Sequence, residues 1–282
     1  MSPTALKKSL AILSLFAALG LAACSTSQSV DLESRNISVE QNAEPAGAGS
    51  TISIAHLLPA SGPTYVTLTV SEVDPNVAPA KSDYRKAAIT SGSGFIVDGA
   101  GYVMTAAHVA VRKGNSISAR AANGRIYSGA VIGILPGNDM AIIKLRGYSG
   151  RAVAPAAPGC RIKGDLVYTL GKPHAQGDTA RVGALESLHF GRAVAYGKFG
   201  YPDAMVLQMG TQKGESGGPV FDGNGRLIGM VVSTLSDGTG RSINLAHAIP
   251  STTLASYLCS QTSCSAPWSA LATQPTDGCA KS

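Results

Sequence analysis

The sequence is poor in charged residues, in aromatic side chains and in long helical patterns. Of its 282 residues only 14% are charged and 5% are aromatic, whereas 44% are hydrophobic and 33 are glycines. Stretches with helical periodicity are few, which argues against a helical bundle, and glycine-rich turns between short apolar runs favour a β-barrel. The formal charge of +6 is scattered and is not interleaved with aromatic residues, so the pattern of a nucleic-acid-binding protein is missing.

Histidine is also scarce, and the histidines do not indicate a metal site. Four of the five show no zinc-ligand spacing relative to the cysteines, namely His56, His174, His189 and His247. We therefore expect no metal and no cofactor.

The first residues have the features of an export signal. Lys7 and Lys8 precede an apolar stretch over residues 10–21, which is followed by Ala22 and Ala23. A basic region, a short apolar core and small residues at the end are typical of a signal peptide. The stretch is shorter than the roughly 20 apolar residues of a membrane-spanning helix. We predict that residues 1–23 are a signal peptide.

Cys24 directly follows these small residues, and Leu21-Ala-Ala-Cys resembles a bacterial lipobox. In lipoproteins of that type the cysteine is acylated and becomes the first residue of the mature chain. Ser25, rather than an aspartate, comes next, which in Gram-negative lipoproteins resembles release toward the periplasmic face of the outer membrane. The alternative is an ordinary secretory signal with a cysteine near its cut site. The resemblance implies a cell-envelope protein that contacts the membrane through acylated Cys24.

Four further cysteines make an even set, namely Cys160, Cys259, Cys264 and Cys279. Disulfides persist in exported proteins, so structural disulfides are expected here. Four cysteines allow three pairings, and the sequence does not choose among them.

Three short motifs contain residues suited to nucleophilic catalysis. Gly-Glu-Ser-Gly-Gly-Pro over residues 214–219 is centred on Ser216, His108 follows one apolar run, and Asp139 opens another. A serine hydroxyl is a weak nucleophile unless a histidine takes its proton and a carboxylate holds that histidine in one tautomer. The order His108, Asp139, Ser216 therefore predicts a catalytic triad.

The sequence around these residues resembles the chymotrypsin-like serine peptidases, most closely the bacterial HtrA/Deg branch. The matching blocks are Ser-Gly-Ser-Gly-Phe-Ile-Val at 91–97, Gly-Tyr-Val-Met-Thr-Ala-Ala-His-Val at 101–109, Asn-Asp-Met-Ala at 138–141, Gly-Glu-Ser-Gly-Gly-Pro-Val at 214–220 and Ala-Ile-Pro-Ser at 248–251. The resemblance spans about residues 91–258. It implies an all-β fold of two antiparallel β-barrels with a short C-terminal helix, and an oxyanion hole formed by the backbone N–H groups of Gly214 and Ser216.

This resemblance and the composition together suggest a domain organisation. Residues 24–50 are read as a flexible tether, and residues 51–258 as the peptidase domain, with the crossing between its barrels near 150–160. Strands are expected over residues 64–70, 165–170, 204–208 and 227–232. Ser251 is expected to cap the helix, with Leu254 and Leu258 on one face. Residues 259–282 would be a cysteine-containing tail, held to the second barrel by disulfides, and the PDZ domain common in HtrA peptidases does not fit there.

The family pattern also places the primary specificity pocket at Gly210, at Val232, Ser233 and Thr234, and at His247. Gly210 stands where relatives specific for basic residues have an acid, so cleavage after Lys or Arg is not expected. His247 either projects into the pocket and attracts acidic residues, or packs against the end of a strand. Glu215 stands where HtrA peptidases usually have asparagine, and we expect it to face solvent or a local partner.

The functional expectation is an exported, lipid-anchored serine endopeptidase that acts on proteins or peptides through an acyl-enzyme. One alternative is a catalytically silent lipoprotein that keeps the fold as a peptide-binding or scaffold module. Another is an α/β-hydrolase, whose order of Ser, acid and His would require Asp237 and His247. That reading leaves little chain behind Ser216 for the remaining elements, and the intact triad favours the peptidase.

Overall fold

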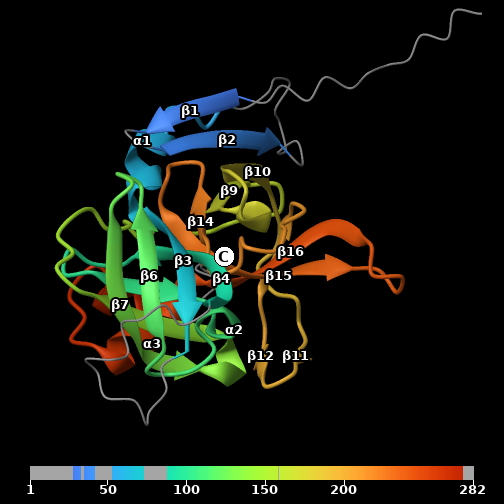
Figure 1. Cartoon of the computed structure of the whole chain (residues 1–282). Helices are drawn as coiled ribbons and strands as arrows, with labels where there is room; N and C mark the ends of the chain where they lie inside the picture. Colours follow the sequence, from blue (N-terminus) through green and yellow to red (C-terminus); the bar gives the residue numbers. More distant parts are fainter. Residues whose placement is uncertain (1–27, 33–34, 42–52, 73–87, 158, 276–282) are drawn as a thin grey trace, which may run out of the picture.

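The computed structural model describes residues 28–32, 35–41, 53–72, 88–157 and 159–275. Most of these residues form strands, which build two barrels (Figure 1). The first barrel is closed in the order β3-β4-β5-β8-β7-β6. Its strands are β3 (Tyr65–Ser71), β4 (Ala88–Ile96), β5 (Tyr102–Thr105), β6 (Ser116–Ala121), β7 (Ile126–Leu135) and β8 (Met140–Leu145).

The second barrel has the order β10-β13-β16-β15-β14-β9 and is closed by pairing of β9 with β10. Its strands are β9 (Leu166–Gly171), β10 (Asp178–Ser187), β13 (Met205–Gln208), β14 (Pro219–Asp222), β15 (Leu227–Ser236) and β16 (Ser242–Pro250). The expected all-β fold of two six-stranded antiparallel barrels is therefore confirmed. A separate hairpin contains β11 (Val194–Tyr196) and β12 (Phe199–Tyr201).

Some strands of the first barrel alternate between buried and exposed residues, whereas β9 and β10 of the second barrel are buried along most of their length. In β3, for example, Leu68 and Val70 are buried while Thr69 between them is exposed, which is the period of a strand with one face on a core. The expected strands at 64–70, 165–170, 204–208 and 227–232 correspond to β3, β9, β13 and the first part of β15.

The expected crossing near 150–160 lies between β8 and β9. Its backbone bonds to both barrels, since Val153 N donates to Ile96 O (2.8 Å) and Leu227 N donates to Ala154 O (2.9 Å). The crossing segment therefore joins the ends of β4 and β15 and helps to hold the two barrels together.

The region expected as a tether contains two strands, β1 (Gln28–Leu32) and β2 (Arg35–Gln41). Strand β2 pairs in parallel with residues 178–182 of β10, so the hairpin extends the second barrel (Figure 1). Ile37 and Val39 are buried, whereas Ser38 between them is exposed. The sequence did not indicate this strand, because Ile37 and Val39 are only two alternating apolar residues in an otherwise polar segment. The predicted signal peptide 1–23 and Cys24 lie outside the described residues.

Helices are short, and none in the described part of the chain is long and apolar enough to span a membrane. They are α1 (Leu58–Ser61), α2 (Ala107–Ala110), α3 (Ser251–Gln261) and α4 (Trp268–Leu271), with 3-10 turns η1 (Gly62–Thr64), η3 (Pro136–Asn138) and η4 (Pro173–Ala175).

The C-terminal helix α3 begins differently from the prediction. Leu254 and Leu258 are buried as expected, but the residue that caps the helix is Pro250, without a side-chain hydrogen bond. Ser251 is already the first helical residue, because Pro250 has the extended backbone of a cap position. The helix also continues past residue 258, so the expected boundary between domain and tail falls inside it.

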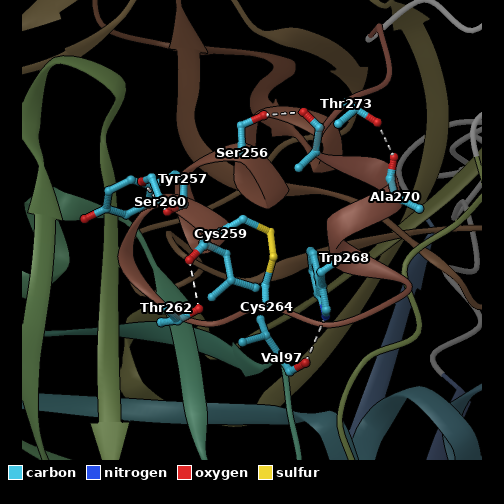
Figure 2. The surroundings of a disulfide bond; sticks show 12 residues. Val97, Ser256, Tyr257, Cys259, Ser260, Thr262, Cys264, Trp268, Ala270 and Thr273 are labelled. Carbon is cyan, nitrogen blue, oxygen red and sulfur yellow. Dashed lines mark hydrogen bonds between the residues drawn. A yellow bond between two sulfur atoms is a disulfide. The ribbon is translucent and has the colours of Figure 1, made fainter.

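The tail contacts both barrels. Trp268 binds the first barrel, and Leu271 and Pro275 lie beside Met205 and Ile228 of the second. Figure 2 shows the bond between Cys259 and Cys264, which closes a short loop within the tail itself. In the same view the buried Trp268 donates from its Nε1 to Val97 O at the end of β4 (2.9 Å). Cys160 is disulfide-bonded as well, and Cys279 lies outside the described residues.

Candidate active site

His108 and Asp139 are brought together by two neighbouring strands of the first barrel. His108 lies on α2, directly after β5, and Asp139 directly precedes β8, which pairs with β5. The two oxygens of Asp139 bind different parts of the histidine, Oδ2 its ring Nδ1 (2.8 Å) and Oδ1 its backbone N–H (2.9 Å). Because an ionised carboxylate only accepts hydrogen bonds, the ring proton sits on Nδ1 and Nε2 is left as the base.

Asp139 is completely buried, and its backbone is left-handed at φ 48°. This turn directs the carboxylate under α2, and the backbone N–H of Ala107 donates to Asp139 O (3.1 Å). His108, by contrast, keeps 26% of its side chain exposed. The arrangement gives a buried acid and a histidine that reaches solvent.

Ser216 lies in the loop before β14, and this loop is fastened to the first barrel by Ser93 on β4. Ser93 N donates to Ser216 O (2.9 Å), and Ser93 Oγ donates to Gly214 O (2.8 Å). Ser93 itself is fully buried. One residue of the first barrel therefore positions the serine loop of the second.

His108 and Ser216 line one open cleft of about 420 Å³, together with Val109, Lys213, Gly214 and residues 88–91. Within the described chain no hydrogen bond links the Ser216 hydroxyl to the imidazole. Such bonds are often long in sites without substrate and shorten when substrate binds.

Gly214 and Ser216 line the cleft, and neither of their backbone N–H groups has an acceptor within the part of the chain that the structure describes. Lys213 O accepts a hydrogen bond from His174 N (2.7 Å), and in a trans peptide the following N–H points the opposite way. The N–H of Gly214 is thus directed away from His174. Gly214 has φ +99°, and a Cβ there would lie 2.3 Å from Lys172 O, so glycine is required. Neither the Gly214 nor the Ser216 amide donates to an acceptor in the described residues.

Glu215 is buried and has a charged partner. Its carboxylate accepts two hydrogen bonds from Nε of Arg181 on β10 (2.7 and 2.9 Å) and one from the backbone N–H of Gln212. Arg181 Nη1 binds Glu40 on β2 at 2.5 Å. Burial raises the pKa of Glu215 and the Arg181 charge opposes that rise. Of the two expected alternatives, exposure to solvent is wrong because Glu215 is buried, whereas a local partner is present in Gln212. Arg181, on a distant strand, is a further partner that was not expected.

The expected specificity residues lie together in the second barrel but do not line the cleft that holds Ser216. Tyr201 OH contacts both Ser233 Oγ (2.7 Å) and His247 Nδ1 (2.8 Å). Val232 is buried and Thr234 bonds to Thr211.

Gly210 follows β13, and a Cβ at this position would lie 2.7 Å from Asn244 Oδ1. The place where an acidic side chain would begin is therefore occupied by an uncharged amide.

His247 is buried, with only 2% of its surface exposed. Its ring lies 4.2 Å from the Phe190 ring and 5.7 Å from the Tyr201 ring, centroid to centroid. Burial lowers the pKa of His247 to about 4, and Arg192 contributes in the same direction. The imidazole is therefore neutral near pH 7, in agreement with the packing alternative.

Sequence reasoning missed several residues that shape this site. They are Ser93 and Arg181, which hold the serine loop, His174, whose N–H orients the neighbouring peptide, and Tyr196, whose hydroxyl donates to Asp139 Oδ2. For Ser93 a signal was present, because it lies in the block 91–97 on which the family resemblance rests. The others contact the site from distant loops and strands.

The comparison with known proteins agrees with this geometry. Residues 92–230 match the family model of the trypsin-like peptidase domain. The chain is 32% identical over 167 residues to a probable periplasmic serine endoprotease DegP-like of Brucella suis, covering 58% of this chain and 31% of that protein. It is 31% identical over 162 residues to the periplasmic serine endoprotease DegP of Salmonella typhimurium, covering 57% and 33%. The chain thus spans about a third of the length of these curated relatives.

Among solved structures, the HtrA-type protease AlgW with a tripeptide superposes with a TM-score of 0.60 at 26% identity, covering 74% of this chain and 63% of that one. The chain therefore contains a trypsin-like peptidase domain with the chymotrypsin-like fold. The proteins to which this chain is similar include HtrA-type serine proteases, as the sequence motifs had indicated.

Acid is expected to destabilise the fold through His247. Its pKa falls from 6.5 to about 4 on folding, so between these values the unfolded chain binds a proton that the folded chain excludes. Stability therefore rises with pH in this window. The contribution is complete above pH 6.5 and is lost as the pH falls toward 4, by up to roughly 3 kcal/mol.

Urea unfolding between about pH 4.5 and 7 measures this slope. We expect a flatter slope for His247→Phe. Its control is Val232→Ala, which changes a buried residue near His247 without removing a titratable group and should leave the slope unchanged. An equal slope in wild type and His247→Phe would contradict the assignment.

Proposed function

We propose that this protein is an exported serine endopeptidase that hydrolyses peptide bonds of envelope or extracellular proteins. The observation that carries the proposal is the cleft itself. The proposal is supported by Ser216 and His108, which line this cleft, by the buried carboxylate on the His108 ring, and by the amides of Gly214 and Ser216, which have no acceptor in the described residues. Those are the groups that acyl transfer requires.

In this mechanism His108 Nε2 takes the hydroxyl proton of Ser216 while Oγ attacks the peptide carbonyl carbon. The carbonyl oxygen becomes negative and accepts hydrogen bonds from the N–H groups of Gly214 and Ser216. The C–N bond then breaks, and His108 gives its proton to the departing amine, which leaves an acyl-enzyme. Water, deprotonated by the same histidine, releases the acid and restores Ser216. Throughout, Asp139 stabilises the imidazolium form of His108.

Ser216, His108 and Asp139 should each be needed for turnover. Ser216→Ala and His108→Ala are expected to abolish casein hydrolysis with the fold retained, because both side chains lie in the open cleft. Asp139→Asn should be slower by roughly 10⁴, since it favours the wrong tautomer. Ser118→Ala, a change of an exposed serine on β6, is the matched control and should leave the rate unchanged. Wild-type turnover in Ser216→Ala would refute the triad.

Fluorophosphonate labelling separates the enzyme from the second hypothesis, a silent peptide-binding or scaffold module. Covalent labelling of wild type at Ser216, with none in Ser216→Ala, supports the enzyme. A folded wild type that binds peptides but is neither labelled nor able to cleave casein would support the silent module instead.

The primary specificity is proposed to be for small or medium uncharged side chains. Gly210 provides no carboxylate, and burying a guanidinium without a partner costs several kcal/mol. His247 is buried and neutral, so it offers no positive charge to an acidic side chain. Profiling with a peptide library tests this. Cleavage mainly after Lys or Arg would show that Gly210 is misplaced, and cleavage after Glu that disappears in His247→Ala would overturn the packing role of His247.

Membrane attachment through Cys24 is a further part of the proposal, supported by the lipobox-like residues 21–24. The similar proteins from Brucella and Salmonella are named as periplasmic, which supports an envelope location, and Ser25 favours the periplasmic face of the outer membrane. Mass spectrometry of the mature protein should find acylated Cys24 as its first residue. Cys24→Ser should give a soluble or uncleaved protein. An unmodified chain that starts elsewhere would contradict lipidation.

A further inference from the structure

The hairpin of β11 and β12 contacts both His108 in the cleft and His247 in the second barrel. It forms a two-stranded sheet apart from both barrels (Figure 1). The rings of Tyr196 and Phe199 meet the His108 ring edge-on, at centroid distances of 5.8 and 6.3 Å. At the other end of the hairpin Tyr201 contacts His247. The hairpin therefore covers one side of the histidine that faces the cleft.

Tyr196 also makes a polar contact with the pair of Asp139 and His108. Its hydroxyl donates to Asp139 Oδ2, the oxygen that also accepts from His108 Nδ1, and it lies 3.5 Å from that Nδ1. With the backbone N–H of His108 on Oδ1, the buried carboxylate has three donors. Burial raises the pKa of Tyr196 well above its ordinary value, and the Asp139 carboxylate raises it further. The hydroxyl consequently keeps its proton and acts as a donor.

We propose that Tyr196 is a positioning residue for peptide hydrolysis: its hydroxyl fixes the Asp139 carboxylate in line with His108, and the hairpin shields this contact from water. This inference rests on the proposed function. Without the hydroxyl, Asp139 Oδ2 would keep one donor, and the carboxylate would be free to rotate about its remaining contacts. The imidazole would then be held less firmly for proton transfer from Ser216.

The contact also has an electrostatic effect with a definite direction. A donor on Oδ2 neutralises part of the carboxylate charge, so its removal leaves a stronger attraction for the imidazolium form of His108. Hydrolysis needs the neutral imidazole, so the acidic limb of the activity profile should move to higher pH. Two cations lie nearby, Lys213 in the cleft and Lys198 at 5.2 Å from the Phe199 ring, and neither changes in the variants below.

The test compares Tyr196→Phe with Tyr148→Phe. Both changes remove one tyrosine hydroxyl, but Tyr148 OH binds Arg151 O (2.8 Å) and does not line the Ser216 cleft. For Tyr196→Phe we expect kcat to fall about tenfold with KM nearly unchanged, and the acidic limb of kcat/KM to move to higher pH. Tyr148→Phe should leave the limb in place. An unmoved limb with kcat within about twofold of wild type in Tyr196→Phe would overturn the proposal.

A spectroscopic readout does not depend on turnover. In the Ser216→Ala background, the low-field proton resonance of His108 Nδ1–H should shift with Tyr196→Phe and stay in place with Tyr148→Phe. Coincident spectra of all three proteins would contradict the positioning role. If wild type is neither labelled by fluorophosphonate nor active on casein, the proposed function fails, and the resonance still decides whether Tyr196 orients the pair.

Discussion

The candidate site depends on how residues 213–217 are held between the two barrels. Ser93, from the first barrel, binds the carbonyl groups of Gly214 and Ser216. His174 binds the carbonyl of Lys213 from the other side. With these three carbonyls occupied, the N–H groups of Gly214 and Ser216 have no acceptor within the described chain, and we propose that they bind the substrate carbonyl. Because these bonds come from elements of both barrels, a shift of the loop would break hydrogen bonds to each of them.

The buried ion pair between Arg181 and Glu215 also holds the Ser216 loop, since Arg181 lies on β10. Taking Arg181 and Glu215 out of water is costly, and a buried pair is stable only when its polar atoms are matched by good partners. Here Arg181 Nε, the Gln212 N–H and Glu40 supply most of those partners. Glu40 belongs to β2, so the N-terminal hairpin contacts the arginine that pairs with Glu215, although the Glu40 charge raises the pKa of Glu215. Removing Arg181 would leave the buried Glu215 carboxylate without its charged partner, next to Ser216.

The sequence indicated the fold and the three candidate residues because each of them lies in a short motif beside an apolar strand. His108, Asp139 and Ser216 are residue types suited to one kind of chemistry, β3 shows its burial in local alternation, and β15 begins as a continuous apolar run. The sequence did not indicate Tyr196, Arg181 or β2. Tyr196 acts on a residue 57 positions away in the chain, and Ile37 and Val39 are buried only because β10 has a free edge beside them. Such contacts are determined by tertiary packing, which local patterns do not encode.

The most direct test of this account is a crystal structure of the protein after reaction with a fluorophosphonate, whose phosphonyl oxygen imitates the oxyanion. The account predicts a covalent bond from Ser216 Oγ to phosphorus, with the phosphonyl oxygen about 2.7–3.1 Å from the nitrogens of both Gly214 and Ser216. The Lys213 carbonyl would remain on His174. A phosphonyl oxygen directed away from these amides, or a Lys213 carbonyl turned into their place, would contradict the claim that the loop is already held in its working shape.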